Sequence, residues 1–237
     1  MDRRTLTRPL QSPEGIALDG SGRLYVVEDI PDGRLIRYTL PEYHHGAGEG
    51  EVIPIPHPAA GYAWEAVDVK PDGSILLAGS NLEAFLSGRD VGGLFSGAVL
   101  YREPGGKWWM PVHSIFDSYS AACFDAEGYN AYFASETMGT VGCISMTSHF
   151  VKAWYSEETI PAPEGIVCLA DGTAIVASES GKLYRMDPHD CIVREIHDFG
   201  DTIESVAWDG AGNRLLITAD GSGSLLALAP VYFNPSC

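Results

Sequence analysis

Apolar and polar residues alternate in short runs along this chain, and one arrangement of such runs occurs five times. Each copy begins with an acidic or small residue, continues through an apolar alternating stretch to a tight turn, and then enters a second apolar run. In every copy the first residue stands eight positions before the turn glycine. These first residues are Glu14, Glu65, Ser120, Glu164 and Glu204. A register that is kept five times indicates an internal repeat.

Each repeat predicts a β-hairpin, because two strand-forming runs joined by a glycine-containing turn are typical of that motif. The second strands of the hairpins are expected at residues 24–27, 75–78, 131–134, 174–177 and 215–218. Further strand-like segments follow at residues 34–38, 98–102, 142–146, 182–186 and 224–227. No segment shows the 3.6-residue period of an amphipathic helix.

The spacing of the repeats predicts the architecture. Their first residues are 51, 55, 44 and 40 positions apart, and a four-stranded propeller blade takes about 40–50 residues. We therefore expect one all-β domain over residues 1–237, a five-bladed β-propeller. Residues 5–10 are expected to join the last blade as its outer strand and so close the ring. Six blades are the alternative count, and a β-sandwich is the alternative architecture, although a sandwich does not explain the fixed register.

The repeat also predicts where acidic side chains gather. The first strand of each propeller blade lines the central channel. The first residues of the repeats are expected just before these strands, so they should form a ring at one channel mouth. The second strands return to the same face, and a second, wider ring is expected where they end. Its members are Asp29, Ser80, Glu136, Glu179 and Asp220.

Converging carboxylates repel one another, and a bound cation removes that penalty. Oxygen ligands without histidine or cysteine favour Ca²⁺, then Mg²⁺ or Mn²⁺. We therefore predict a divalent cation, with Ca²⁺ first, whose ligands come from Glu14, Glu65, Glu164 and Glu204. The alternative is that these glutamates cap strand ends by accepting hydrogen bonds from backbone amides.

Long connections are expected at the same mouth, including residues 81–96, an insertion between two strands of the second blade. Aromatic side chains on such connections are expected to rim a pocket for a small-molecule substrate. The expected substrate-binding residues are Tyr62, Trp64, Phe85, His113 and Tyr119. For each of these taken singly, packing between blades is the alternative.

Two segments resemble the SMP-30/gluconolactonase/strictosidine-synthase-like superfamily of calcium-dependent propellers. They are Ser12-Pro13-Glu14-Gly15 and Ala162-Pro163-Glu164-Gly165, each followed by an apolar strand and a turn glycine. In that family an acid in the first blade and an acid in a later Pro-(Asp/Glu)-Gly motif bind the metal. The resemblance therefore implies that Glu14 and Glu164 are ligands. The family's amide ligand has no counterpart among the other ring positions, and its members typically have six blades.

The resemblance implies a lactonase-like or esterase-like hydrolase. A channel-bound Ca²⁺ would act as a Lewis acid on a carbonyl oxygen, and Glu164, Glu136 or Glu179 would activate water as a general base. A biosynthetic cyclase or isomerase needs the same pocket and stays an alternative. So does a non-catalytic interaction propeller with a structural cation or none, because propellers host both catalysis and scaffolding.

Charge and apolar content argue against several classes of partner. The formal net charge of −17 argues against nucleic acid and anionic membrane surfaces. No apolar run approaches the length needed to cross a membrane, and no apolar signal region follows Arg3 and Arg4, so a cytoplasmic protein is expected. His44 and His45 are expected in an exposed loop on the face opposite the acids.

The cysteines are odd in number, widely spaced and without a Cys-x-x-Cys pair. They are Cys123, Cys143, Cys168, Cys191 and Cys237. This pattern predicts mostly buried thiols in a reducing compartment rather than a disulfide framework. A zinc site is not expected, because no two cysteines have ligand spacing.

Overall fold

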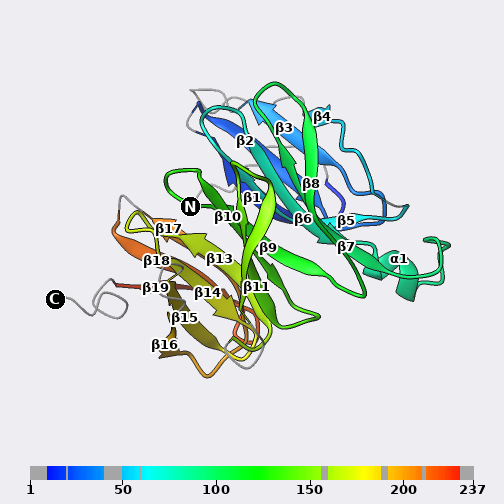
Figure 1. The fold of residues 1–237 in the computed structure, drawn as a ribbon. Helices are drawn as coiled ribbons and strands as arrows, with labels where there is room; N and C mark the ends of the chain where they lie inside the picture. The colour runs from blue at the N-terminus through cyan, green and yellow to red at the C-terminus, as the bar shows by residue number, and fades with distance from the viewer. Residues whose placement is uncertain are drawn as a thin grey trace. The chain divides into compact units, whose positions relative to one another are not determined.

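The structure is a computed structural model that describes residues 10–19, 21–39, 50–58, 60–155, 160–187, 192–209 and 212–229. It divides into two compact units, Met1–Ser118 and Tyr119–Cys237. The first unit contains two antiparallel sheets and the second contains three (Figure 1). The chain is therefore all-β with the five blades of a β-propeller, as predicted. Residues 5–9, His44 and His45, on which two further expectations rest, lie outside the described residues.

The first unit consists of two four-stranded meanders. One comprises β1 (Pro13–Leu18), β2 (Arg23–Glu28), β3 (Leu35–Thr39) and β4 (Glu51–Ile53). The other comprises β5 (Ala63–Val69), β6 (Ile75–Ser80), β7 (Ser96–Arg102) and β8 (Trp108–Ile115). The predicted insertion connects β6 to β7, and it contains a short helix, α1 (Leu82–Leu86). That helix was not predicted, because five residues are too few to show a helical period.

The second unit continues the same topology. Its first sheet comprises β9 (Tyr119–Phe124), β10 (Asn130–Ser135), β11 (Thr140–Ser145) and β12 (Phe150–Tyr155). Its second comprises β13 (Pro163–Cys168), β14 (Ala174–Ser178), β15 (Lys182–Asp187) and β16 (Ile192–Asp198). Its third comprises β17 (Ile203–Asp209), β18 (Arg214–Ala219) and β19 (Ser224–Leu228), so this blade has three strands within the described residues.

Four of the five turn glycines of the repeat have a positive φ, and in the fifth turn Asn213, which follows Gly212, has a positive φ of 47° instead. Gly22, Gly73 and Gly172 have φ angles of 79°, 89° and 85°, a region that residues with a β-carbon rarely adopt. The amide of Gly22 donates to the Asp19 carbonyl oxygen at 3.2 Å, and its equivalents in the other two hairpins bond in the same way. The constant distance between the first residue of the repeat and the glycine therefore reflects the position of a tight turn in each of these hairpins.

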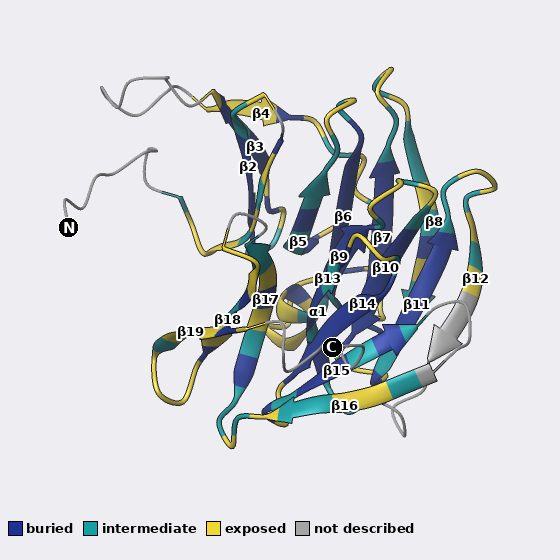
Figure 2. Cartoon of the chain, turned by 90° about the vertical axis from the view of Figure 1, so that its left-hand side faces the viewer, coloured by how far each residue is buried: buried dark blue, intermediate teal, exposed yellow. Residues whose placement is uncertain are grey.

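The second strand of each complete blade lies deepest in the structure. Strands β6, β10 and β14 are buried along almost their whole length (Figure 2). Apolar side chains from neighbouring sheets within a unit meet on them, for example Tyr25, Trp64 and Leu77 in the first unit. This packing holds adjacent first strands side by side, β1 with β5 and β13 with β9 and β17. The described helix, α1, is far too short to cross a membrane.

Candidate functional site

Each first strand departs from regular pairing at the residue that begins the repeat. In β5, Trp64 pairs with Gly79 and Ala66 with Ala78, so Glu65 is an extra residue without a partner in β6. The same irregularity recurs in all five blades, at Glu14 with Gly15, and at Glu65, Ser120, Glu164 and Glu204. A β-bulge of this kind turns the extra residue out of the normal alternation of side chains. These residues therefore lie inside the first strands, which corrects the expectation that they lie just before them.

The two Pro-Glu-Gly segments share a strained backbone. Ser12 and Ala162, which precede the prolines, have φ angles of 43° and 37°, whereas a residue before proline normally has an extended conformation. Their carbonyl oxygens accept hydrogen bonds from the amides of Asp29, at 2.8 Å, and Glu179, at 3.0 Å. The strained residue thereby ties the end of the second strand to the bulge. Unusual backbone of this kind is concentrated at functional sites.

The glycine of each segment lets the next blade approach. A β-carbon on Gly165 would lie 3.0 Å from the carbonyl oxygen of Glu204, and one on Gly15 would lie 2.7 Å from that of Glu65. Bulges of adjacent blades therefore pack directly on one another. Glu14 and Glu65 are neighbours in the first unit, and Glu164 and Glu204 are neighbours in the second. That these four bind one cation together stays a prediction.

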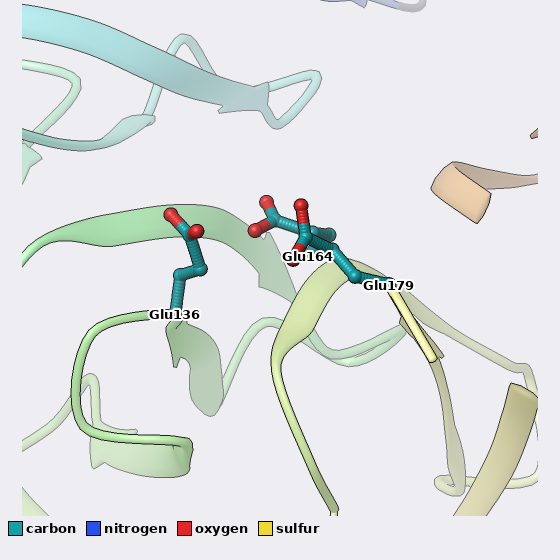
Figure 3. Close-up of side chains that lie close together, drawn as sticks. All are labelled: Glu136, Glu164 and Glu179. Carbon is teal, nitrogen blue, oxygen red and sulfur yellow. The ribbon is translucent and has the colours of Figure 1, made fainter. Parts of the chain in front are cut away.

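Three carboxylates of the second unit come together. One oxygen from each of Glu136, Glu164 and Glu179 lies within 4.8 Å of the others. Glu164 projects from the bulge of β13, Glu179 directly follows β14, and Glu136 directly follows β10 of the preceding blade (Figure 3). Glu136 and Glu179 are exposed, and Glu164 is half-buried. The cluster joins the three residues that were predicted as catalytic candidates, although only Glu164 belongs to the predicted metal ligands.

Partial burial and neighbouring negative charges raise the pKa values of several of these carboxyl groups. The pKa of Glu136 is raised, first by loss of solvent around its carboxyl and then by the negative charge of Glu179. In the first unit, partial burial and the charge of Asp29 raise the pKa of Glu14. Partial burial and the charge of Glu83 likewise raise the pKa of Asp29. Both units thus hold carboxylates at a cost in free energy that a cation would remove.

The cluster in the second unit fits a calcium ion. Its donors are carboxylate oxygens only, which hard cations prefer. Two oxygens on opposite sides of a Ca²⁺ ion are about 4.8 Å apart, because the Ca–O distance is about 2.4 Å, and the three oxygens here lie within 4.8 Å of one another. The corresponding separation around Mg²⁺ is about 4.2 Å, because its oxygen ligands lie at about 2.1 Å. A cation would therefore be held in this cluster, by Glu164 and Glu179 of one blade, with Glu136 of the preceding blade beside it.

Hydroxyl groups accompany Glu65 in the first unit. The Ser118 hydroxyl lies 3.2 Å from Oε1 of Glu65 and 2.9 Å from the Ser80 hydroxyl. Both serines are buried. Ser80 was predicted at this strand end, but Ser118 was missed. Its position before β9 gave no chemical signal, because a serine in a connection is common.

Three of the five residues that were predicted to rim a substrate pocket are buried. Trp64, Tyr62 and Tyr119 have no exposed surface, which corrects the expectation that they bind substrate. Trp64 packs against Tyr62 with ring centroids 5.5 Å apart, and Tyr119 packs edge-on to Phe133 at 5.4 Å. Residues beside a bulge face the neighbouring sheet, so large side chains there fill the core.

The other two predicted rim residues are exposed, but on different elements. His113 lies on β8, the outermost strand of its sheet, with β6 and β7 between it and β5. Phe85 lies on α1 and is 37% exposed. Its ring is 5.7 Å from that of Phe95, which is 5.6 Å from that of Phe116. Phe85 therefore belongs to an aromatic cluster on the insertion and keeps its place as a candidate for binding an apolar group.

Comparison with known proteins supports the fold. No family model matches this chain, and no curated protein matches it in sequence. A gluconolactonase from Xanthomonas campestris has a similar structure, with a TM-score of 0.70 at 16% identity over 92% of this chain and 71% of that one. A luciferin-regenerating enzyme matches with a TM-score of 0.69 at 15% identity, over 94% of this chain and 78% of that one. The predicted resemblance to SMP-30/gluconolactonase-like propellers is thus confirmed in the fold.

Proposed function

We propose that this protein is a calcium-dependent hydrolase of lactones or related esters, with its active site at Glu136, Glu164 and Glu179. The observation that carries the proposal is the approach of their three carboxylate oxygens to within 4.8 Å of one another. The strained backbone before Glu164 gives further support. A gluconolactonase among the structures of similar fold supports the reaction class.

The three carboxylates take different roles in this proposal. Glu164 and Glu179 belong to one blade and hold the cation, while Glu136 reaches the cluster from the preceding blade. A bound Ca²⁺ supplies a Lewis acid for the carbonyl oxygen of the substrate. Glu136 accepts a proton from the water whose oxygen attacks the carbonyl carbon.

The remaining steps conserve protons and atoms. Attack of water forms a bond from its oxygen to the carbonyl carbon, and the ring C–O bond of the lactone then breaks. The proton held by Glu136 passes to the departing alkoxide oxygen, so the product is a hydroxy acid and Glu136 is again ionised. The cost of leaving out this proton transfer is about 10²- to 10⁴-fold in rate.

The test compares single variants with a matched control. Hydrolysis of glucono-δ-lactone and of an aryl acetate is followed by acid release, in excess calcium and in EDTA, and calcium binding is measured by calorimetry. Glu136→Gln should lower kcat about 10²- to 10⁴-fold and leave the calcium Kd within a few-fold. Glu164→Gln and Glu179→Gln should each weaken calcium binding and, through it, hydrolysis.

Glu127→Gln is the control, because Glu127 is exposed in the turn between β9 and β10, whereas Glu136 follows β10 at its far end, and the strand between them is about 20 Å long. It should change neither property. Calcium binding that depends on Glu164 and Glu179 but accompanies no hydrolysis would instead identify a binding propeller with a structural cation. Wild-type protein that neither binds calcium nor hydrolyses these substrates would reject the proposal.

A further inference from the structure

Two cysteines that are far apart in sequence meet in the second unit. The Sγ atoms of Cys123, in β9, and Cys168, in β13, are 2.8 Å apart, although 45 positions separate them in the chain. We propose that Cys123 and Cys168 form a reversible disulfide that links the third and fourth blades. This inference does not rest on the proposed hydrolase activity.

The two sulfurs are already close to bonding distance, and their strands pack against each other. A disulfide has an S–S distance of about 2.05 Å, so the two sulfurs need to close by only about 0.8 Å. Strands β9 and β13 pack side by side, and the Ser120 hydroxyl donates to the Pro163 carbonyl oxygen across them at 3.0 Å. Bond formation therefore needs only a small further approach of two sulfurs that already lie on neighbouring strands.

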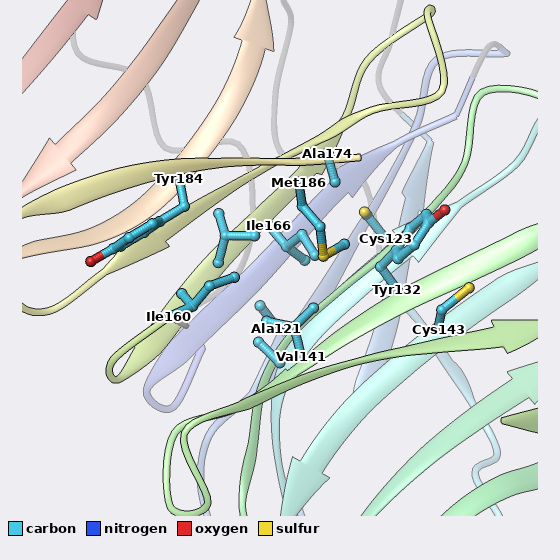
Figure 4. Close-up of a cluster of buried hydrophobic side chains, with 12 residues drawn as sticks. Ala121, Cys123, Tyr132, Val141, Cys143, Ile160, Ile166, Ala174, Tyr184 and Met186 are labelled. Atoms are coloured by element: carbon cyan, nitrogen blue, oxygen red, sulfur yellow. The ribbon is translucent and has the colours of Figure 1, made fainter. Parts of the chain in front are cut away.

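The third described cysteine is excluded as a partner for Cys123. Tyr132 of β10 pairs with Cys123 on one side and with Cys143 on the other, and Figure 4 shows both cysteines beside Tyr132. Two strand spacings of about 4.8 Å therefore separate their backbones, which is beyond the reach of a disulfide. The Cys143 thiol also hydrogen-bonds with the Tyr132 hydroxyl, and burial raises the pKa of Cys143.

A metal site is a poorer use of the two sulfurs. Structural zinc takes four ligands from cysteine and histidine. Among the described residues, no histidine, cysteine or carboxylate supplies a third ligand atom within 4.8 Å of both sulfurs. Two thiols in near contact with no third ligand are arranged for oxidation to a disulfide.

The reaction is thiol–disulfide exchange with a low-molecular-weight disulfide such as glutathione disulfide. Cys168 is partly exposed and Cys123 is buried, so the Cys168 thiolate attacks first and releases one glutathione. The Cys123 thiolate then attacks the Cys168 sulfur of the mixed disulfide and releases the second glutathione. The protein loses two electrons and two protons, and one glutathione disulfide becomes two thiols.

The folded full-length protein is equilibrated with glutathione redox buffers, quenched with acid, alkylated and digested. Trypsin places Cys123 and Cys143 in one peptide, 108–152, and Cys168 in another, 153–182. Added Glu-C protease cleaves after Glu127 and Glu136 and so separates Cys123 from Cys143 without any mutation. A linked pair containing Cys123 and Cys168 is expected under oxidising conditions, and it should disappear in dithiothreitol.

Stability provides the second measurement. A cross-link that closes a 45-residue segment should raise Tm by about 5–15 °C. Cys123→Ser and Cys168→Ser should abolish that shift, while Cys143→Ser, the matched buried control, should keep both the shift and the linked peptides. Thiols that stay unlinked in the folded oxidised wild type would overturn the proposal, and so would a link between Cys168 and Cys143.

Discussion

Replacing Glu179 by glutamine should stabilise the protein without calcium and destabilise it with calcium. The Glu179 carboxylate makes no hydrogen bond or ion pair with any residue that the structure describes, and it lies beside Glu136 and Glu164. Its backbone amide still donates to Ala162 after the substitution. Glu179→Gln therefore removes one charge from the cluster and keeps the shape of the side chain.

The size of the effect follows from the oxygen spacing. Two unit charges 4.8 Å apart, which is the upper limit of the oxygen separations in this cluster, repel by about 1 kcal/mol in water and about 3.5 kcal/mol at an effective dielectric constant of 20. Because Glu136 and Glu179 are exposed, the lower value applies to each of the two pairs. Glu179→Gln should thus add about 1–2 kcal/mol to the free energy of unfolding in EDTA, which raises Tm by about 2–8 °C.

Calcium should reverse this order. A ligand at 100 times its Kd stabilises the folded state by about 2.7 kcal/mol, and the variant loses a ligand. Tm is measured for wild type, Glu179→Gln and the control Glu127→Gln, in EDTA and in calcium. Glu179→Gln should have a higher Tm than wild type in EDTA and a lower one in calcium, whereas Glu127→Gln should show no such reversal. A variant that is less stable than wild type in EDTA would refute the reasoning, because it would show that the carboxylate accepts a stabilising hydrogen bond.

The same cluster has a pH dependence of defined sign. The pKa of Glu136 is raised in the folded state, so its contribution to stability is fully present below the ordinary pKa of about 4.5 and is lost as pH rises through the raised value. In EDTA, wild type should therefore gain stability between neutral pH and about pH 4.5. Glu179→Gln should show a smaller gain, because the Glu179 charge contributes to the raised pKa.

Three further substitutions test the architecture. Gly165→Ala should cost about 1–3 kcal/mol, because its β-carbon would meet the backbone of the next blade at 2.9 Å, whereas the control Gly105→Ala meets no atom within 4 Å and should be near neutral in urea unfolding. Ala162→Gly should leave stability unchanged or raise it by up to about 1 kcal/mol, because the native φ of 37° suits glycine; a loss would show that no strain is relieved. The pKa of Asp19 is lowered to about 2, since four hydrogen bonds from Arg23 and Ser21 outweigh the opposing effect of burial. Its contribution, about 1–2 kcal/mol, should fade as pH falls from about 4 to 2, and Asp19→Asn should remove this part of the acid unfolding curve.

Local pattern was enough to predict the blades. Alternating apolar residues and a turn glycine at a constant distance are properties of single hairpins, and strands β2, β6, β10, β14 and β18 lie where those signals place them. The bulges were not predicted, because an extra residue is visible only when the pairing with the next strand is known. The glycine after Glu14 and Glu164 was the available signal, since glycine in a strand often marks a bulge or a close backbone approach.

The site was harder to predict than the fold, because it depends on which surfaces other strands cover. Trp64 and Tyr119 stand beside bulges, and sequence alone does not tell whether a neighbouring sheet buries them. The contact between Cys123 and Cys168 could not be predicted from the sequence either, because the two cysteines are 45 residues apart and lie on different sheets. Glu136, Glu164 and Glu179 were singled out as acids at strand ends, but their approach to one another depends on the packing of two blades.

The serine at the third bulge explains why the carboxylates gather where they do. Every blade presents one bulge residue and one strand-end residue, yet Ser120 is the bulge residue that carries no charge. Its hydroxyl donates to the carbonyl oxygen of Pro163, next to Glu164, and so holds the bulge of β13 against β9. A glutamate there would add a fourth negative charge and lose that contact. The uncharged position thus lets Glu136 of the same blade approach Glu164 and Glu179, and it leaves a cluster of three acids that one divalent cation can neutralise in large part.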